Sequence, residues 1–350
     1  MPEVDGPLAD HPRVKGWIRF LGKRLFSEVV SIWGICTIAF FAVRFVGNPI
    51  AMLAGPDPTP VAMASVRSQL GLDHPVIGQY LVYLGGLFRG NLGHSAVSGL
   101  AVTSELAQYL PATLELLVAA LFLAVVATIV LAVLGARNRR GVAARIGNVL
   151  IQGGSSVPVF WLGLLLVYVF YYILRWAPAP LGQVNPNLTV PSGPTHFLFI
   201  DSLISGNWTV VASALAYLVL PAVSLSLSLL PTLLQTTRST IEEVLDSSYI
   251  KTMQACGLAS WRLYIRYVLR NSLVPFINVL AMTFGYAVGG AVLVEEVFQW
   301  PGVGFYAVSS MTSSDYAPVV GIVLVSAIIN VTLYNIADVV SAIIDPRITL

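Results

Sequence analysis

Six long apolar runs, separated by more polar stretches, dominate the pattern of the chain. They cover residues 26–46, 112–136, 148–174, 210–234, 272–294 and 317–341. Each is about as long as the roughly 20 residues that a helix needs to cross a bilayer. Because backbone groups in lipid must be hydrogen-bonded within the chain, we expect every run to form a helix. The pattern therefore predicts an all-α integral membrane protein with six transmembrane helices.

The composition agrees with this pattern and excludes a water-soluble fold. Of the 350 residues, 56% are hydrophobic and only 10% are charged, whereas soluble domains carry about 25% charged residues. The two cysteines are Cys36, in the first run, and Cys256, in a polar loop. Because they fall on different sides of the expected membrane, no disulfide between them is predicted.

Basic residues are divided unevenly between the two sides of the expected bundle. Most of the 19 Lys and Arg residues lie in the N-terminal tail and in the loops after the second and fourth runs. The few on the opposite side are Arg44, Arg67, Arg89 and Arg175. Since Lys and Arg are retained on the cytoplasmic side, both termini are expected to be cytoplasmic.

Residues 1–25 form a cytoplasmic tail ahead of a single membrane domain, expected over 26–350. Apolar residues recur in this tail at helical spacing, with basic residues between them: Val14, Trp17, Ile18, Leu21 and Leu25. Such a segment either lies flat on the inner leaflet as an interfacial helix or is a polar tail whose charge fixes the orientation. Both interpretations stay open.

The external loop 47–111 is too long to be a plain connector. Its second half predicts an amphipathic helix that Gly90 ends. The apolar positions of that helix are Tyr80, Leu81, Tyr83, Leu84 and Leu87. We expect it to pack on the outer face of the bundle. The candidate contacts to an external partner are Tyr80, Tyr83, Leu84 and Leu87.

Motifs for catalysis, nucleotide binding and metal binding are missing from the sequence. There is no GxxxxGK[ST] loop, so ATP is not bound by that route, and there is no HExxH. The four histidines lie outside the apolar runs, which argues against an intramembrane protease or metalloenzyme: His11, His74, His94 and His196. We therefore expect no catalytic residue and no metal site.

Ionisable residues in the middle of a span usually mark an ion-coupled transport site. Here the ionisable residues of the runs are placed near the run ends: Glu28, Arg44, Glu115 and Asp338. Side chains near an end can reach the interface or pair with one another. An ion-coupled carrier or a channel is therefore disfavoured, and the energy for transport is expected to come from a partner.

The loop 237–271 is the most charged stretch of the chain. Its first apolar positions continue the fourth run outward. A short helix over 249–256 is then expected, ended by Gly257, and a second helix over 261–269 follows. Two helices joined at a glycine are more than a lipid anchor needs. We therefore favour docking to a soluble partner over binding to lipid headgroups.

Several motifs, in the order in which they occur, together resemble those of one transporter family. They are LGLDHPVIGQYLVYLGGLFRGNLGHS (70–95), LPATLEL (110–116), SVPVFWLGLLL (156–166), YIKTMQACGL (249–258), RYVLRNSLVP (266–275), EEVFQWPGVG (295–304) and DPRI (345–348). On these motifs the chain resembles the permease subunits of ATP-binding-cassette importers, in particular the first permease of the dipeptide and oligopeptide group. Lys251, Thr252 and Met253 stand where the broader importer signature has Glu-Ala-Ala.

This resemblance implies a type I importer permease fold, multi-pass in a bacterial inner membrane. It implies a homologous second permease, two cytoplasmic ATPases and an external substrate-binding lipoprotein as partners, besides membrane lipid and without nucleic acid. ATP and Mg would be bound by the ATPases, so this chain would bind no cofactor and would not itself be an enzyme.

The resemblance also assigns the coupling to the ATPases to one segment of the cytoplasmic loop. Its residues are Tyr249, Lys251, Thr252, Met253, Ala255, Gly257, Leu258 and Arg262. We expect Tyr249, Met253 and Leu258 to fill an apolar cleft on the ATPase. Lys251 and Arg262 would pair with its acidic residues. Gly257 would act through its backbone conformation rather than through contact.

The substrate that the resemblance implies is a peptide. Relatives of the group also carry haem, nickel or glutathione, and these remain alternatives with the same architecture. An ion-coupled carrier or channel is the alternative of a different class.

Overall fold

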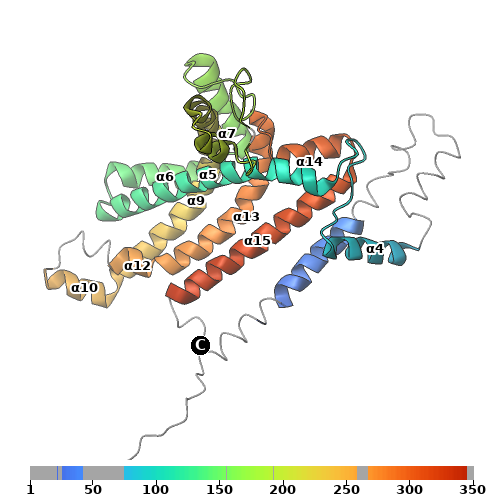
Figure 1. Cartoon of the computed structure of the whole chain (residues 1–350). Coiled ribbons are helices and arrows are strands. Elements are labelled where there is room, and N and C mark those ends of the chain that lie inside the picture. The colour runs from blue at the N-terminus through green and yellow to red at the C-terminus, as the bar shows by residue number, and fades with distance from the viewer. Residues whose placement is uncertain are drawn as a thin grey trace, which may run out of the picture.

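The computed structural model describes residues 22, 26–41, 75–154, 156–191, 193–257 and 267–344. Within these ranges the regular structure is helical, apart from one isolated bridge between His94 and Ala101. The all-α prediction is thus confirmed for the part of the chain that is described. Figure 1 shows the helices as an elongated bundle with a smaller lobe at one side.

Four helices are long and apolar enough to cross a membrane. They are α5 (Val102–Arg137), α9 (Trp208–Asp246), α13 (Leu273–Phe298) and α15 (Tyr316–Ile344). The main core joins three of them, since Leu116 of α5, Leu225 of α9 and Ala291 of α13 are buried in one cluster. These helices confirm the second, fourth, fifth and sixth apolar runs as helical.

The third run is not one continuous helix as predicted. It is divided into α6 (Val142–Gly154) and α7 (Val159–Leu166), and α7 continues as the π-helix η1 (Val167–Ile173). The directions of the two parts differ by 117°. Pro158 explains the break, because proline lacks an N–H and disfavours a helical conformation in the residue before it.

The first run is represented by an apolar helix over Phe26–Phe41, and α4 (Val76–Phe88) is a second short apolar helix. Residues 42–46 of the predicted first span lie outside the described residues, as does the predicted N-terminal tail helix. Counting the bent pair as one span, the described helices include up to five candidate spans. Six transmembrane helices therefore stay a prediction.

The helix α5 begins ten residues earlier than the sequence indicated. The prediction placed its start at Ala112, after Pro111, whereas Pro111 lies inside the helix in the structure. Val102 and Leu106, in the added turns, are buried against Tyr306 and its neighbours. This burial offsets the hydrogen bond that Pro111 cannot donate.

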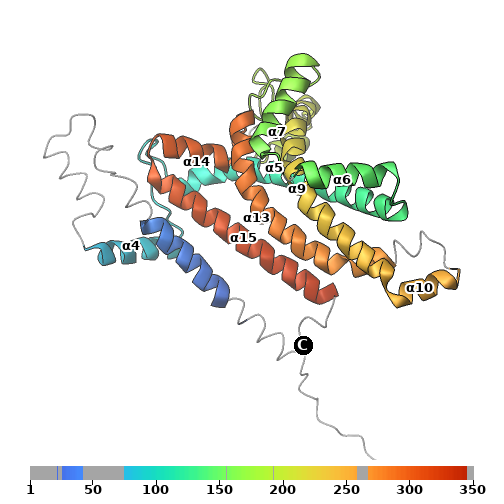
Figure 2. The ribbon, with the colours of Figure 1, turned by 180° about the vertical axis from the view of Figure 1, so that it is seen from behind.

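The predicted cytoplasmic and external elements gather at opposite ends of the bundle. At one end lie α10 (Ser248–Ala255), α12 (Leu269–Asn271) and the turn after α5. At the other lie α4, α8 (Leu198–Ile204) and α14 (Val303–Thr312). Figures 1 and 2 both show α10 and α14 at the two ends of α13. We call them the α10 end and the α14 end.

Candidate functional site

The helix α9 carries the chain beyond the main core toward the candidate coupling segment. Asn207 caps its start, with its side-chain oxygen accepting a hydrogen bond from the N–H of Val210 at 3.3 Å, and the helix continues to Asp246. Ile241, near its end, is fully buried. The prediction that the apolar positions around Ile241 extend the fourth run is confirmed.

The helix α10 follows after a single extended residue, Ser247. Ile250, one of its residues, is fully buried in a small cluster with Ala136 of α5, Ile241 of α9 and Val268. This cluster, which we call the anchor cluster, attaches α10 to the ends of the long helices. Packed side chains of this cluster therefore connect α10 to α5 and α9.

Tyr249 lies on the outer side of α10. Its side chain is 42% exposed, and its hydroxyl accepts a hydrogen bond of 2.8 Å from Nδ2 of Asn271 in α12. Lys251, Thr252 and Ala255 are exposed as well. The outward face of α10 thus consists of Tyr249, Lys251, Thr252 and Ala255, all of which were candidate coupling residues.

Met253 takes a different position from these residues. It is half-buried and packs against the anchor cluster. Met253 thus lies one helical turn after Tyr249 but packs inward beside Ile250, whereas Tyr249 is more exposed. That Tyr249 and Met253 insert into one cleft of the ATPase stays a prediction.

Gly257 follows α10 with a φ of +78°. A Cβ added there would meet no atom within 4 Å, so the position is open and only its backbone conformation requires glycine. The prediction that Gly257 ends this helix through its conformation is confirmed. Leu258 and Arg262, and most of the predicted helix over 261–269, lie outside the described residues.

A polar contact joins two helices near the α10 end. Arg238 of α9 pairs with Glu242 on the next turn, with 3.1 Å between Nε and Oε1. Its Nη1 also donates a hydrogen bond to Oδ1 of Asn148 in α6. The α6 helix is thereby fastened to α9 close to the anchor cluster.

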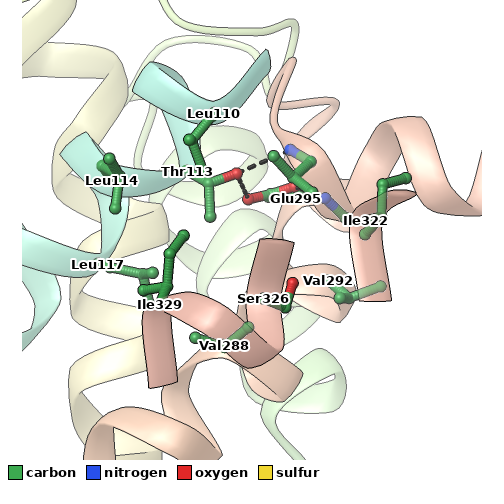
Figure 3. A pocket seen from close by; sticks show the side chains of 12 residues that line it. Leu110, Thr113, Leu114, Leu117, Val288, Val292, Glu295, Ile322, Ser326 and Ile329 are labelled. Carbon is green, nitrogen blue, oxygen red and sulfur yellow. Dashed lines mark hydrogen bonds between the residues drawn. The ribbon is translucent and has the colours of Figure 1, made fainter. Parts of the chain in front are cut away.

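At the opposite end, a buried carboxylate organises the turn between α13 and α14 (Figure 3). Glu295 has no exposed surface. Its Oε1 accepts from the Thr113 hydroxyl at 2.7 Å, and its Oε2 accepts from the N–H groups of Gly304 and Phe305 at 2.7 and 3.0 Å. Thr113 in turn accepts from the N–H of Val303 at 2.7 Å. One side chain of α13 therefore caps the start of α14 and fastens it to α5.

Glycines make this close approach possible. A Cβ at Gly302 would lie 2.4 Å from the carboxyl group of Glu295, and one at Gly304 would lie 2.5 Å from Cα of Val292. Next to them the buried indole of Trp300 donates from Nε1 to the carbonyl of Ala112 at 2.9 Å. The PGVG sequence is therefore a tight turn that closes onto α5. We call this assembly the Glu295 cap.

The Glu295 cap borders a cavity of about 40 Å³ between α5, α13 and α15. Apart from Glu295, Thr113 and Ser326, its lining is aliphatic (Figure 3). Because one water occupies about 10–15 Å³ on this measure, the cavity holds water-sized molecules and no peptide. A separate, larger groove of about 380 Å³ is lined by the loop between η1 and α8, including Gln183, and by Gln299 and Pro301.

Other acidic residues at the α14 end are bonded in the same manner. Asp315 accepts from the Ser95 hydroxyl and from the N–H groups of Ala96 and Val97, at 3.1 and 3.3 Å for the latter two. Tyr306 donates to Glu105. Burial, reinforced by this bond to Glu105, raises the pKa of Tyr306, so its phenol stays protonated and able to donate.

The position of Glu115 also corrects the sequence interpretation. The sequence placed it near the end of its apolar run, whereas it lies well inside α5. Its carboxylate accepts from the N–H of Phe199 at 2.9 Å and from Nε2 of Gln183 at 3.2 Å. It therefore fastens the outer loop and α8 to α5.

The sequence analysis did not identify Glu295, Thr113 or Asp315 as organising residues. One signal was available, since the EEVFQWPGVG motif places an acidic pair at the end of an apolar run, just before a glycine-rich turn. Nothing in the sequence pointed to the Thr113 partner, which is 182 residues away.

The predicted external contact residues of α4 face their own chain. The hydroxyls of Tyr80 and Thr37 lie 2.6 Å apart, and the rings of Tyr80 and Tyr83 each lie 5.3 Å from that of Phe40. Leu84 and Leu87 are half-buried. The contact of these four α4 residues with an external partner remains a prediction.

Among the described residues, no group of three His, Cys, Asp or Glu side chains is placed to hold a metal ion. Cys36 is buried and Cys256 is exposed, and both are free thiols.

Comparison with known proteins gives matches over almost the whole chain. Residues 124–350 match the model of the binding-protein-dependent transport system inner membrane component, and residues 17–117 match the N-terminal model of such membrane components. The chain is 36% identical over 329 residues to the probable D,D-dipeptide transport system permease protein DdpB of Escherichia coli (strain K12), covering 94% of this chain and 96% of that protein.

Two further relatives are similar over a comparable length. The di/tripeptide transport system permease protein DppB of Pseudomonas aeruginosa (strain UCBPP-PA14) is 32% identical over 340 residues, covering 95% of this chain and 98% of its own. The dipeptide transport system permease protein DppB of Escherichia coli (strain K12) is 33% identical over 336 residues, with the same coverage of 95% and 98%.

These matches confirm the resemblance that the motifs indicated. Together with the long apolar helices, they identify a multi-pass protein of the bacterial inner membrane. The chain belongs to the family of inner membrane components of binding-protein-dependent transport systems.

Proposed function

We propose that this chain is one of two permeases in an ATP-driven importer of dipeptides or oligopeptides. The observation that carries the proposal is α10, a short helix with an exposed outward face that is fastened to the long helices by one buried residue, Ile250. The names of the relatives support the peptide substrate. The partners are a homologous second permease, two ATPases that bind ATP and Mg, and an external substrate-binding protein.

In this proposal, α10 transmits the movement of the ATPases to the membrane helices. Its outward face contacts the ATPase, with Tyr249 as the aromatic anchor and Lys251 as the basic contact. The anchor cluster carries the displacement to α5 and α9, and the bond from Asn271 to Tyr249 carries it to α12, which precedes α13. The long helices then tilt and expose the route between the two permeases to alternate sides.

The same proposal fixes the topology and the division of the chain. Residues 1–25 are a cytoplasmic tail and 26–350 form a permease domain of six transmembrane helices with both termini in the cytoplasm. The loop 47–111 is external, with α5 taking up its last residues, and 237–271 is the cytoplasmic coupling loop. This topology is supported by the position of α10 and of the basic turn after α5 at the same end of the bundle, because basic loops are retained on the cytoplasmic side.

The alternative substrates are haem, nickel and glutathione. They use the same architecture, and in such systems the external receptor makes the selection. Purifying the external receptor that binds this permease, and identifying the ligand it retains, decides between them. A bound peptide supports the proposal, and a bound metal ion or tetrapyrrole replaces the peptide with that ligand.

The alternative of a different class is an ion-coupled carrier or channel. Carboxylates on membrane helices are the observation that favours it: Glu105 and Glu295 are buried, and Glu115 is half-buried. Each of these, however, accepts hydrogen bonds from its own chain, and Glu295 accepts three. Groups bonded in this manner position helices, so we favour the ATP-driven importer.

The test exchanges Gly257 in the complete importer, reconstituted in vesicles. Gly257→Val forces a branched residue into φ +78°, at a cost of about 1–2 kcal/mol. We expect it to leave assembly intact and to uncouple ATP hydrolysis from transport. Gly257→Asn is the matched variant, because asparagine tolerates this conformation, and it should retain most of the coupling.

Two outcomes contradict the proposal. If both Gly257 variants transport like the wild type, α10 and the turn after it do not couple the ATPase to the membrane. If the purified chain alone conducts ions, the chain is a channel or carrier.

Separately, Tyr249→Ala should weaken binding of the ATPase by about 2 kcal/mol, as expected for an aromatic anchor.

A further inference from the structure

Within the described part of the chain, one face of α4 is apolar and uncovered. The opposite face, with Tyr80 and Tyr83, packs on the helix Phe26–Phe41. On the uncovered side the exposed fractions are large: Ile77 74%, Leu81 62%, Val82 75% and Phe88 91%. The α4 sequence, VIGQYLVYLGGLF, contains no charged residue. We call these four side chains the outer stripe.

We propose that α4 lies within the outer boundary of the bilayer and that its outer stripe contacts lipid acyl chains. The helix has 13 residues, which is about 20 Å at 1.5 Å per residue. This is shorter than the roughly 30 Å of hydrocarbon, so α4 cannot cross the membrane. A short helix that is apolar on both sides keeps both faces away from water only if one face packs on protein and the other on lipid.

Its contacts place α4 at the level where the membrane helices end. Tyr80 reaches Thr37 and the ring of Phe41, in the last turns of the helix Phe26–Phe41. After α4, the segment around Ser95 is fastened to Asp315, directly before α15 begins. Figures 1 and 2 show α4 beside the same end of that first helix and on the side of α14.

Continuity with an exposed apolar surface identifies lipid as the occupant. The helix on which α4 packs itself exposes large apolar side chains: Phe26 72%, Val29 59%, Trp33 54% and Ile38 70%. In a membrane protein such a surface faces acyl chains, and the outer stripe extends it at the α14 end. Arg89, exposed directly after α4, can extend its guanidinium to the phosphate layer.

A protein partner fits the outer stripe less well. An external receptor binds reversibly from water, so the surface on which it docks is exposed to water between binding events and must include polar groups. Such interfaces carry about one hydrogen bond per 100–200 Å². The outer stripe offers no polar side chain at all, so lipid contact accounts for it without a polar partner.

The test measures collision of spin labels with two probes in the full-length chain, reconstituted in vesicles of phosphatidylethanolamine and phosphatidylglycerol. Single cysteines for labelling are introduced as Ile77→Cys, Leu81→Cys or Phe88→Cys, in a Cys256→Ser background that leaves Cys36 buried. Oxygen concentrates in lipid, and a nickel chelate stays in water. We expect oxygen to relax all three labels several-fold faster than the chelate.

The control is Val97→Cys, on an exposed loop at the same end of the molecule. Its label should show the reverse order, with faster relaxation by the nickel chelate. The proposal is overturned if the outer-stripe labels behave like the Val97 control, since α4 then faces water. It is equally overturned if those labels are protected from both probes, since a protein then covers α4.

Discussion

The two ends of the bundle are fastened in opposite ways. At the α14 end, Glu295 and Asp315 are buried and accept hydrogen bonds from hydroxyls and backbone N–H groups, several of them from segments far away in the chain. At the α10 end, a short helix exposes most of its side chains and is fastened by the buried Ile250. The first end joins three helices in one arrangement, and the second leaves an exposed surface, which contacts the ATPase in the proposed function.

This difference matches what an alternating transporter requires of its helices. A displacement applied at one end tilts a bundle only if the helices are joined firmly elsewhere, because loosely joined helices would absorb it by sliding. The Glu295 cap joins α5, α13 and α14, and the anchor cluster joins α5, α9 and α10. Since α5 belongs to both, it connects the α10 end with the α14 end.

The largest expected effect comes from removing the Glu295 carboxylate at the α14 end. Glu295→Ala leaves the Thr113 hydroxyl and the N–H groups of Gly304 and Phe305 without their acceptor. A buried donor without a partner costs about 1–3 kcal/mol, so we expect a loss on the order of 3–5 kcal/mol in the free energy of unfolding. Thermal denaturation in detergent measures it.

Glu296→Ala is the matched control for this change. Glu296 is the next residue on α13 and is exposed, so its removal should change stability by less than about 0.5 kcal/mol. Equal denaturation temperatures for the two variants would show that the Glu295 cap does not stabilise the fold.

At the α10 end, Ile250→Ala should reduce the coupling of ATP hydrolysis to transport more than it reduces the stability of the fold. Truncating a buried Ile costs about 2–5 kcal/mol, and we expect about 2 because α10 is short and can move away from the bundle. The variant should hydrolyse ATP with less transport per ATP, and its denaturation temperature should fall by only a few degrees. Glu243→Ala, at an exposed position near the end of α9 and outside the candidate coupling residues, is the control.

The close approach of α14 to α13 predicts a smaller effect at a glycine. In Gly304→Ala the new Cβ would lie 2.5 Å from Cα of Val292, and overpacking of this kind costs about 1–3 kcal/mol. Gly289→Ala, on the same α13 helix with no atom within 4 Å of its Cβ, should leave stability unchanged or slightly raised. If the two variants denature alike, the turn relaxes without cost.

Features that depend on neighbouring residues were predictable from the sequence. Helical periodicity identified the extension of α9, and the glycine signal placed the end of α10 at Gly257, with the positive φ that the structure shows. The apolar runs identified α13 and α15 because a span is a property of one continuous segment. No partner residue is needed for any of these inferences.

Features that depend on distant residues were not predictable. Pro111 indicated a helix start, yet burial of Val102 and Leu106 against α14 and α15 continues α5 through it. The pairing of Glu295 with Thr113 depends on the same folding of α14 onto α5. The inward position of Met253 likewise follows from the anchor cluster, which unites residues of α5, α9, α10 and the segment before α12.

The smallest expected effect separates the two roles of Tyr249. Tyr249→Phe keeps the exposed ring for a partner and removes only the hydroxyl that accepts from Asn271. One such hydrogen bond contributes about 1 kcal/mol, so the variant should bind the ATPase nearly as well as the wild type and lose only a small part of the coupling.

A double-mutant cycle with Asn271→Ala makes this comparison quantitative. If the bond between α10 and α12 carries part of the displacement, each single variant should lower transport per ATP by a similar small factor. The double variant should then be no worse than either, because both changes remove the same interaction. Additive losses would mean that Tyr249 and Asn271 act separately, and α10 would then transmit its movement through the anchor cluster.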